Sequence, residues 1–344
     1  MLGYLAGIFV DHQDLKKVLT FTNLLRALIV LALLLVGKVL ILTYLIIIAL
    51  ATVTLFFLPA EGSALPSLVK EKKDLLAANS LFTITIQASV IVGFVAAGPM
   101  LALLGEKTTL VILAACFIAA FGFVWSLPDA IRSLEEREKV KPLKSFIDGI
   151  SFFFRTRSVR DAIFFLTSAQ AIILVLATIA PGFVDKILNL DVKLTSIILV
   201  APAAFGMILG SLALGQVGHR YKEKDLVNAG LVLAAGGFLA LSFLERTHLN
   251  TYLYFLAVIC IILLGVATSL ITVPATTELQ ADTPERMRGR TYGILGTFGS
   301  GASAIPVILA GTAGDVLGVR TVILTLGVLS LLAALYRLGG RRYT

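Results

Sequence analysis

Ten long apolar runs constrain the fold of this chain more than any other feature of its sequence. The runs lie near 18–37, 39–60, 81–104, 108–127, 161–184, 194–217, 225–244, 251–274, 291–313 and 319–338. A helix needs about 20 mainly apolar residues to cross the hydrocarbon core of a bilayer. The runs are continuous rather than alternating, which argues against the strands of a membrane barrel. The sequence therefore predicts an all-α polytopic membrane protein, with residues 1–10 forming the end of a further span.

The composition supports a lipid environment and excludes several other classes of protein. Of the 344 residues, 58% are hydrophobic and 15% are charged, whereas soluble domains carry about 25% charged residues. Cys116 and Cys260 both lie in apolar runs, so we interpret them as buried small side chains and not as ligands or a disulfide. The chain has no nucleotide phosphate loop and no zinc-protease motif. We therefore expect no enzyme activity, no metal and no cofactor.

The basic residues alternate between the two sides of the predicted membrane. The formal net charge is +8, and one set of alternating loops holds 22 Lys and Arg residues while the other holds 6. Cytoplasmic loops of membrane proteins carry such an excess. We therefore expect no nucleic-acid partner, a cytoplasmic (inner) membrane location with several passes, and a cytoplasmic C-terminus.

The sequence divides into two similar halves joined by a polar linker. The segment 128–160 is the longest polar stretch, and its second part has Phe146, Ile150, Phe153 and Phe154 near one helical face, followed by basic residues. This pattern predicts an amphipathic helix at the membrane surface. The expected divisions are an incomplete helical bundle over 1–127, the cytoplasmic linker over 128–160, and a six-helix bundle with a basic tail over 161–344.

Two loop motifs recur at a nearly constant distance along the chain. The loop that begins at Gly7 is echoed at Gly215, and the loop from Leu65 is echoed at Leu279, at offsets of 208 and 214 residues. Such spacing indicates a parallel repeat. Six spans in each half would mean that the first half lacks its first span and most of its second. A truncated gene, a wrong start codon and a pseudogene product all fit that expectation.

The motifs together resemble the major facilitator superfamily. The motif of the loop after the second span of that family stands here as Gly7, Asp11, His12, Asp14, Lys16 and Lys17, with His12 in place of the usual Arg and Leu15 in place of a usual base. The segments around Arg26, LPSLVKEKKDLLAAN from Leu65 and RMRGR from Arg286 resemble the branch that contains enterobactin and macrolide exporters. The resemblance implies two six-helix bundles related by a pseudo-two-fold axis.

The same resemblance implies a function. It points to a secondary active transporter that exports an amphiphilic small molecule of the drug, macrolide or siderophore class by alternating access. The implied partners are the substrate, the lipid bilayer and a coupling ion, expected to be the proton, and the expected state is a monomer. The alternatives are a membrane receptor or assembly protein on the same fold, or an inactive truncated product.

A conformational gate is expected at the cytoplasmic side. By resemblance, Asp11 would cap the helix that begins near Thr291, because a carboxylate is favoured at a helix N-terminus. The expected gate residues are Asp11, Lys16, Lys17, Arg220, Arg288 and Arg290. The alternative is that these are solvated loop charges, placed only by the sidedness of the membrane.

The remaining candidates lie within the spans. Arg26 is the only formal charge well inside one, and we favour a structural role, with snorkelling to the headgroups as the alternative. Polar side chains share helix faces in three spans, and either a substrate path or contacts between helices would explain them. They are Thr83, Gln87, Thr167, Gln170, Thr178, Thr268 and Thr272.

Overall fold

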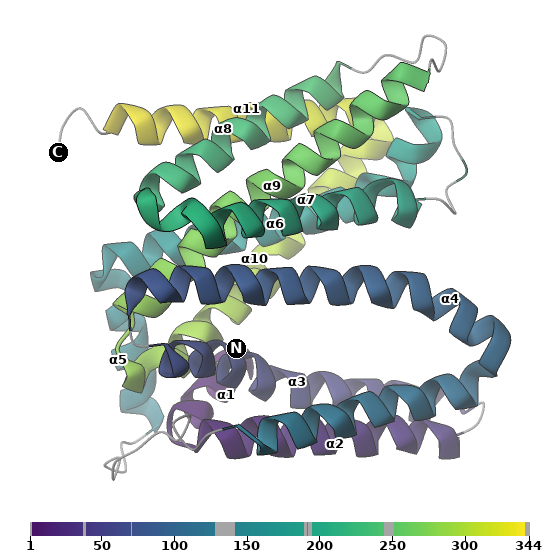
Figure 1. Cartoon of the computed structure of the whole chain (residues 1–344), viewed down its shortest axis with the longest axis vertical. Coiled ribbons are helices and arrows are strands. Elements are labelled where there is room, and N and C mark those ends of the chain that lie inside the picture. Colours follow the sequence, from purple (N-terminus) through teal and green to yellow (C-terminus); the bar gives the residue numbers. More distant parts are fainter. Residues whose placement is uncertain are drawn as a thin grey trace. The chain divides into compact units, whose positions relative to one another are not determined.

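The computed structural model is helical throughout the part of the chain that it describes (Figure 1). The described residues are 2–36, 39–69, 71–127, 142–188, 191, 195–243 and 251–340. The start of the predicted linker, 128–141, and the basic tail beyond residue 340 lie outside them. Within the described residues, nine helices are long and apolar enough to cross a membrane. The prediction of an all-α membrane protein is confirmed.

The helices follow the predicted runs closely. Their bounds are α1 Leu2–Asp11, α2 Leu15–Val36, α3 Leu40–Leu68, α4 Lys72–Trp125, α5 Pro142–Arg155, α6 Arg157–Lys186, η3 Ser196–Val200, α7 Ala201–Val217, η4 Gly218–Arg220, α8 Glu223–Ser242, α9 Thr251–Asp282, η5 Glu285–Met287, α10 Arg288–Val316 and α11 Val319–Gly340.

One helix contains two of the ten predicted spans. Helix α4 covers both 81–104 and 108–127, and its only non-helical residue is Gly105, with φ 74° and ψ 171°. A side chain is strongly disfavoured at such angles, but glycine adopts them readily. The chain therefore turns within a single residue, and Figure 1 shows the resulting sharp bend in α4.

The described chain forms two compact units, and α4, α6, α9 and α10 contribute to both. Unit 1 comprises residues 1–70, 95–160 and 280–297, and unit 2 comprises 71–94, 161–279 and 298–344. In unit 1, α3 packs against α1 and α2, around buried Val10, Leu19 and Ala60. In unit 2, α8 packs against α11, and the largest apolar cluster includes Phe183, Phe238 and Ile323.

Many large apolar side chains point away from these cores. Leu35, Leu103 and Phe123 are 88%, 82% and 74% exposed. In water such a surface would aggregate, but in a bilayer the acyl chains cover it and the helices satisfy their own backbone groups. The exposed apolar surface therefore has the character expected of lipid-facing spans.

Small residues bring α7 and α9 together in unit 2. A Cβ atom on Gly206 would overlap the carbonyl group of Ile262, and one on Gly210 would lie 2.9 Å from the Cβ of Ser269. The Ser269 hydroxyl donates to the Met207 carbonyl at 2.7 Å. Close packing therefore accounts for the glycine pair on α7, as small-xxx-small motifs do in membranes generally.

Adding one methyl group at this crossing should destabilise unit 2. We expect Gly206→Ala to lower the free energy of unfolding by about 1–3 kcal/mol, because the new Cβ overlaps a backbone carbonyl. Thermal unfolding of the purified protein in detergent measures the effect. Gly236→Ala is the matched control, because a Cβ there meets no atom within 4 Å. It should be neutral or slightly stabilising, since alanine favours helix. Equal melting temperatures for the two variants would contradict this packing.

Candidate functional site

The first described helix ends at Asp11, and the turn that follows holds this residue in place. Helix α1 is apolar and ends at Asp11. The His12 ring then closes the last turn, because its Nδ1 donates to the Ile8 carbonyl at 2.7 Å. Asp14 starts the next helix, where its Oδ1 accepts from the backbone N–H groups of Lys16 and Lys17 at 3.0 and 3.3 Å. Asp14 is thus an N-cap of α2.

Glycines allow the backbone of α1 to touch the backbone of α10. A Cβ on Gly7 would overlap the Gly289 carbonyl group, and a Cβ on Gly293 would lie 2.7 Å from the Gly3 carbonyl oxygen. Side chains at these positions would hold the two helices apart. Because none is present, the carboxylate one helical turn after Gly7 reaches the first amides of α10.

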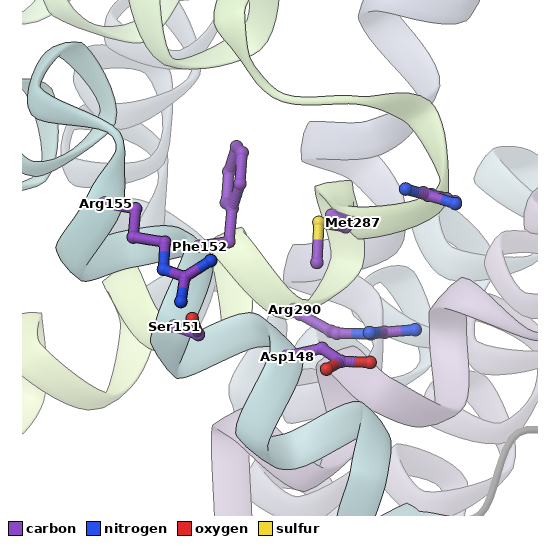
Figure 2. A pocket seen from close by; sticks show the side chains of 7 residues that line it. Asp148, Ser151, Phe152, Arg155, Met287 and Arg290 are labelled. Carbon is purple, nitrogen blue, oxygen red and sulfur yellow. The ribbon is translucent and has the colours of Figure 1, made fainter.

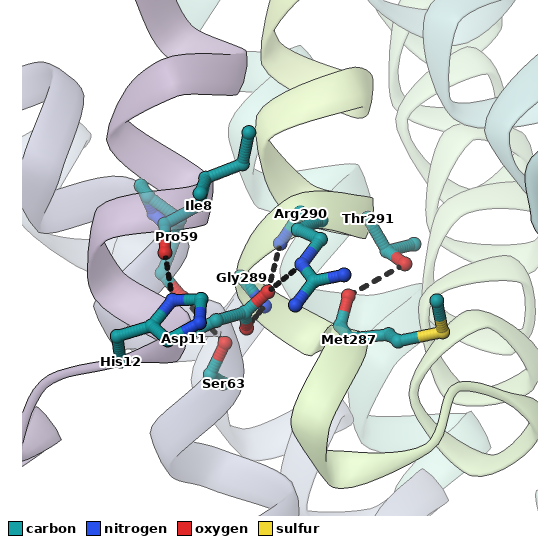
Figure 3. A network of polar contacts seen from close by, with 9 residues as sticks. All are labelled: Ile8, Asp11, His12, Pro59, Ser63, Met287, Gly289, Arg290 and Thr291. Atoms are coloured by element: carbon teal, nitrogen blue, oxygen red, sulfur yellow. Dashed lines mark hydrogen bonds and ion pairs between the residues drawn. The ribbon is translucent and has the colours of Figure 1, made fainter. Parts of the chain in front are cut away.

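Asp11 caps α10 with two hydrogen bonds and forms an ion pair with Arg290 (Figure 3). Its Oδ1 accepts from the Gly289 N–H at 2.6 Å, and its Oδ2 accepts from the Arg290 N–H at 3.1 Å. The Arg290 Nε lies 3.0 Å from the same Oδ2. Both side chains are buried, so removing either partner would leave an uncompensated charge, at a cost of about 3–5 kcal/mol. The carboxylate also gains from the positive end of the helix dipole.

The other expected gate residues have different surroundings. The Lys16 Nζ donates to the Leu127 carbonyl at 2.6 Å, just beyond the end of α4. Lys17 is exposed. Arg288 is half-buried, and Glu285 and Tyr292 are its electrostatic neighbours. Arg220 is exposed on η4, in unit 2. Arg290 is thus an expected base that forms an ion pair with Asp11.

Arg26 lies inside unit 1 among aromatic rings. Its guanidinium carbon is 4.0 Å from the centroid of the Phe57 ring and 5.8 Å from that of Phe117. The side chain is only 7% exposed, so it does not reach outward as the snorkelling alternative required. Glu61, one turn after Phe57 on α3, is its electrostatic partner. A charge held this way is favoured by cation–π attraction and by the opposite charge of Glu61.

A second polar group lies beside Glu61. The Gln280 Nε2 donates to the Tyr292 hydroxyl at 2.7 Å and lies 3.4 Å from the Gly62 carbonyl oxygen. The Tyr292 ring packs directly over Gly62, where a Cβ would lie 2.5 Å from ring carbons. Glu61 and Arg288 are both electrostatic neighbours of Tyr292. Unit 1 therefore contains a polar connection between the Arg26 region and the start of α10.

The expected substrate-path residues all lie in unit 2, and most of them form hydrogen bonds within their own helix. The hydroxyls of Thr83, Thr178, Thr268 and Thr272 each donate to the carbonyl four residues earlier, at 2.8 to 2.9 Å. Gln87 donates to the Met207 sulfur on α7 at 2.9 Å. Gln170 is exposed on α6, and the buried Thr167 hydroxyl has no hydrogen-bond partner within the described structure. Gln87, Thr167 and Gln170 are thus the members not bonded to their own helix.

Sequence reasoning missed the side-chain pairs that join distant segments. It named neither Gln280 nor Tyr292, and it did not find the aromatic partners of Arg26. Helical periodicity shows which residues share a face, but it does not show which face of another helix they meet. The only available signal was that a polar residue within a span must have a partner.

Comparison with known proteins agrees with this architecture. Residues 1–306 match the Major Facilitator Superfamily. The enterobactin exporter EntS of Escherichia coli is 26% identical over 256 residues, which cover 73% of this chain and 58% of the exporter. The multidrug efflux pump Tap of Mycolicibacterium fortuitum is 24% identical over 340 residues, covering 95% of this chain and 80% of the pump.

A solved structure shows the same fold. The fucose:proton symporter FucP of Escherichia coli superposes with a TM-score of 0.73 at 13% identity, over 98% of this chain and 87% of that one. The family match, the helical fold and the sequence relatives agree with each other. They also agree with the expectation of a transporter and not an enzyme. The chain therefore belongs to the major facilitator superfamily of membrane transporters.

Proposed function

We propose that this transporter exports an amphiphilic small molecule of the drug, macrolide or siderophore class, by alternating access. The observation that carries the proposal is the Asp11 cap on α10, which joins the first described helix to one that begins 277 residues later. A bond of this kind can hold one conformation and be released, as rocking transport requires. The relatives that are named as exporters of enterobactin and of drugs support the direction and the substrate class.

The substrate path of this proposal runs along unit 2. Gln87, Thr167 and Gln170 are its primary contacts, since none of them bonds to its own helix. Thr83, Thr178, Thr268 and Thr272 contribute more weakly, because their hydroxyls are already occupied. Apolar and aromatic side chains between them suit a lipophilic body with a few polar groups.

In this proposal the transporter is coupled to protons, and Glu61 is the residue that carries the proton. An ionisable residue within a membrane span is expensive to keep and commonly serves ion or proton movement. Glu61 faces the Arg26 cation and lies near Tyr292, so its protonation state alters the charge balance of unit 1. Protonation would release Arg26 from its carboxylate partner.

The first test concerns the direction of the chain across the membrane. With Cys116 replaced by serine, Lys107→Cys should react with an impermeant maleimide in intact cells. Lys224→Cys should react only after the cells are permeabilised, because its loop belongs to the basic set. Gel-shift labelling measures both. Equal reactivity from outside would contradict a cytoplasmic position for the basic loops and the C-terminus.

The second test concerns the gate. Asp11→Asn replaces one acceptor oxygen by an NH₂ donor and leaves the buried Arg290 cation without its carboxylate partner, which should weaken the hold on α10 by about 3–5 kcal/mol. We expect faster maleimide labelling of a Thr83→Cys reporter from the cytoplasmic side, with normal expression. Asp14→Asn is the control, because asparagine caps a helix as well as aspartate does. Unchanged labelling and unchanged transport would remove Asp11 from the mechanism.

The third test concerns the function itself. Proteoliposomes that contain the full chain should move a radiolabelled macrolide or catecholate siderophore when a proton gradient is imposed. A protonophore should abolish this flux, and Glu61→Gln should reduce it at least about tenfold, because the proton carrier is lost. Glu106→Gln is the control. Glu106 is an exposed carboxylate next to the bend of α4, so this variant should transport normally. Flux that ignores the protonophore refutes proton coupling, and the absence of flux for every substrate favours the receptor or assembly alternative.

A further inference from the structure

A pocket of about 480 Å³ lies in unit 1 between the linker helix and the start of α10 (Figure 2). Helix α5 forms one wall, and η5 with the first turn of α10 forms the other. The lining residues are Asp148, Ser151, Phe152, Arg155, Arg286, Met287 and Arg290. Three guanidinium groups thus line the pocket together with a single carboxylate. Arg290 is paired with Asp11, whereas Arg155 and Arg286 are exposed to solvent.

Contacts with α1 hold the α5 wall in place. Gly149 lies directly on the hydroxyl of Tyr4, where a Cβ would overlap the phenol oxygen. Tyr4 is 4% exposed, and its electrostatic neighbours are Arg290, Asp11 and Asp148. The pocket therefore adjoins the Asp11 cap through Arg290, which belongs to both. Its α5 wall is packed against α1.

The surroundings of the pocket favour a phosphate group carried by a lipid. Next to Arg155, the side chains of Ile150 and Phe154 are 36% and 64% exposed, as expected for a helix whose apolar side enters the membrane surface. Arginine binds phosphate through paired, charge-assisted hydrogen bonds, and the Ser151 hydroxyl can donate another. Phe152 and Met287 supply apolar contact for a glycerol backbone or acyl chain. Anionic headgroups are concentrated at the cytoplasmic membrane surface.

We propose that this pocket binds the phosphate group of an anionic ligand, supplied by an acidic phospholipid headgroup. Arg155 and Arg286 bind the phosphate, and Asp148 limits the affinity through repulsion. The proposal goes beyond transport, since it assigns a lipid site next to the gate and is tested by binding alone.

Lipid retention by the purified full chain tests the proposal. Native mass spectrometry from neutral detergent would compare dioleoyl-phosphatidylglycerol with dioleoyl-phosphatidylcholine. We expect preferential retention of phosphatidylglycerol. Arg155→Gln and Arg286→Gln should each weaken it at least about tenfold, the loss expected for a charge-assisted hydrogen bond. Asp148→Asn should strengthen it, because the repelling charge is gone. Lys222→Gln is the control, because it removes one exposed positive charge from unit 2.

The arginine variants should lower the affinity for lipid, whereas Asp148→Asn should raise it. The test therefore stays decisive even if one variant is misfolded, since misfolding cannot raise affinity. Competition distinguishes the two sources of phosphate. If millimolar inorganic phosphate displaces phosphatidylglycerol and binds with the same dependence on Arg155 and Arg286, the site takes free phosphate. If phosphate does not compete, the lipid is the ligand. Equal retention of the two lipids, or retention that the three pocket variants leave unchanged, overturns the proposal.

Discussion

The bonding of the Asp11 carboxylate to the start of α10 is the interaction on which the arrangement of α1 and α10 in unit 1 depends. A buried charge is tolerated only when its attraction to nearby groups exceeds the cost of leaving water. Here two backbone amides, the dipole of α10 and one guanidinium supply that attraction. Each of them requires α10 to begin where it does and α1 to end where it does. The glycine contacts, the closure of α1 by His12 and the new cap at Asp14 all serve that placement.

Much of the fold could be predicted because lipid leaves few choices. Without water, backbone groups must bond within their own segment, so a run of 20 apolar residues is almost always a helix. Within the described residues, each predicted run coincides with helix over nearly all of its length. The break between the spans 81–104 and 108–127 was also predicted, and the structure places it at Gly105. What the sequence did not indicate is that the conformation of one glycine makes the turn. Backbone conformation at a single glycine cannot be inferred from charge.

The candidate site could be predicted only in part. The position of Asp11 followed from the family resemblance, and the structure places it at the amides of α10. Lys16 was expected in the same charge cluster, and its Nζ donates to the Leu127 carbonyl just beyond α4; its part in a gate stays a prediction. The link from Gln280 to Tyr292 has no sequence signature, because the partners differ in chemistry and meet only through the packing of α9, α10 and α3. Four of the five threonine hydroxyls in the expected substrate path donate to their own helices, and their place in a substrate path stays a prediction.

The crossing of α1 and α10 has a mechanical consequence. Most helix pairs interlock through side-chain ridges that sit in grooves, so parting them forces several side chains to change rotamer at once. At Gly7 and Gly289 the backbones meet without such ridges. At this point the contact relies on backbone packing and not on interlocking side chains. In the gate that we propose, resistance to separation is then concentrated in the contacts of Asp11 and Arg290, so chemistry at two side chains governs the motion of two whole helices.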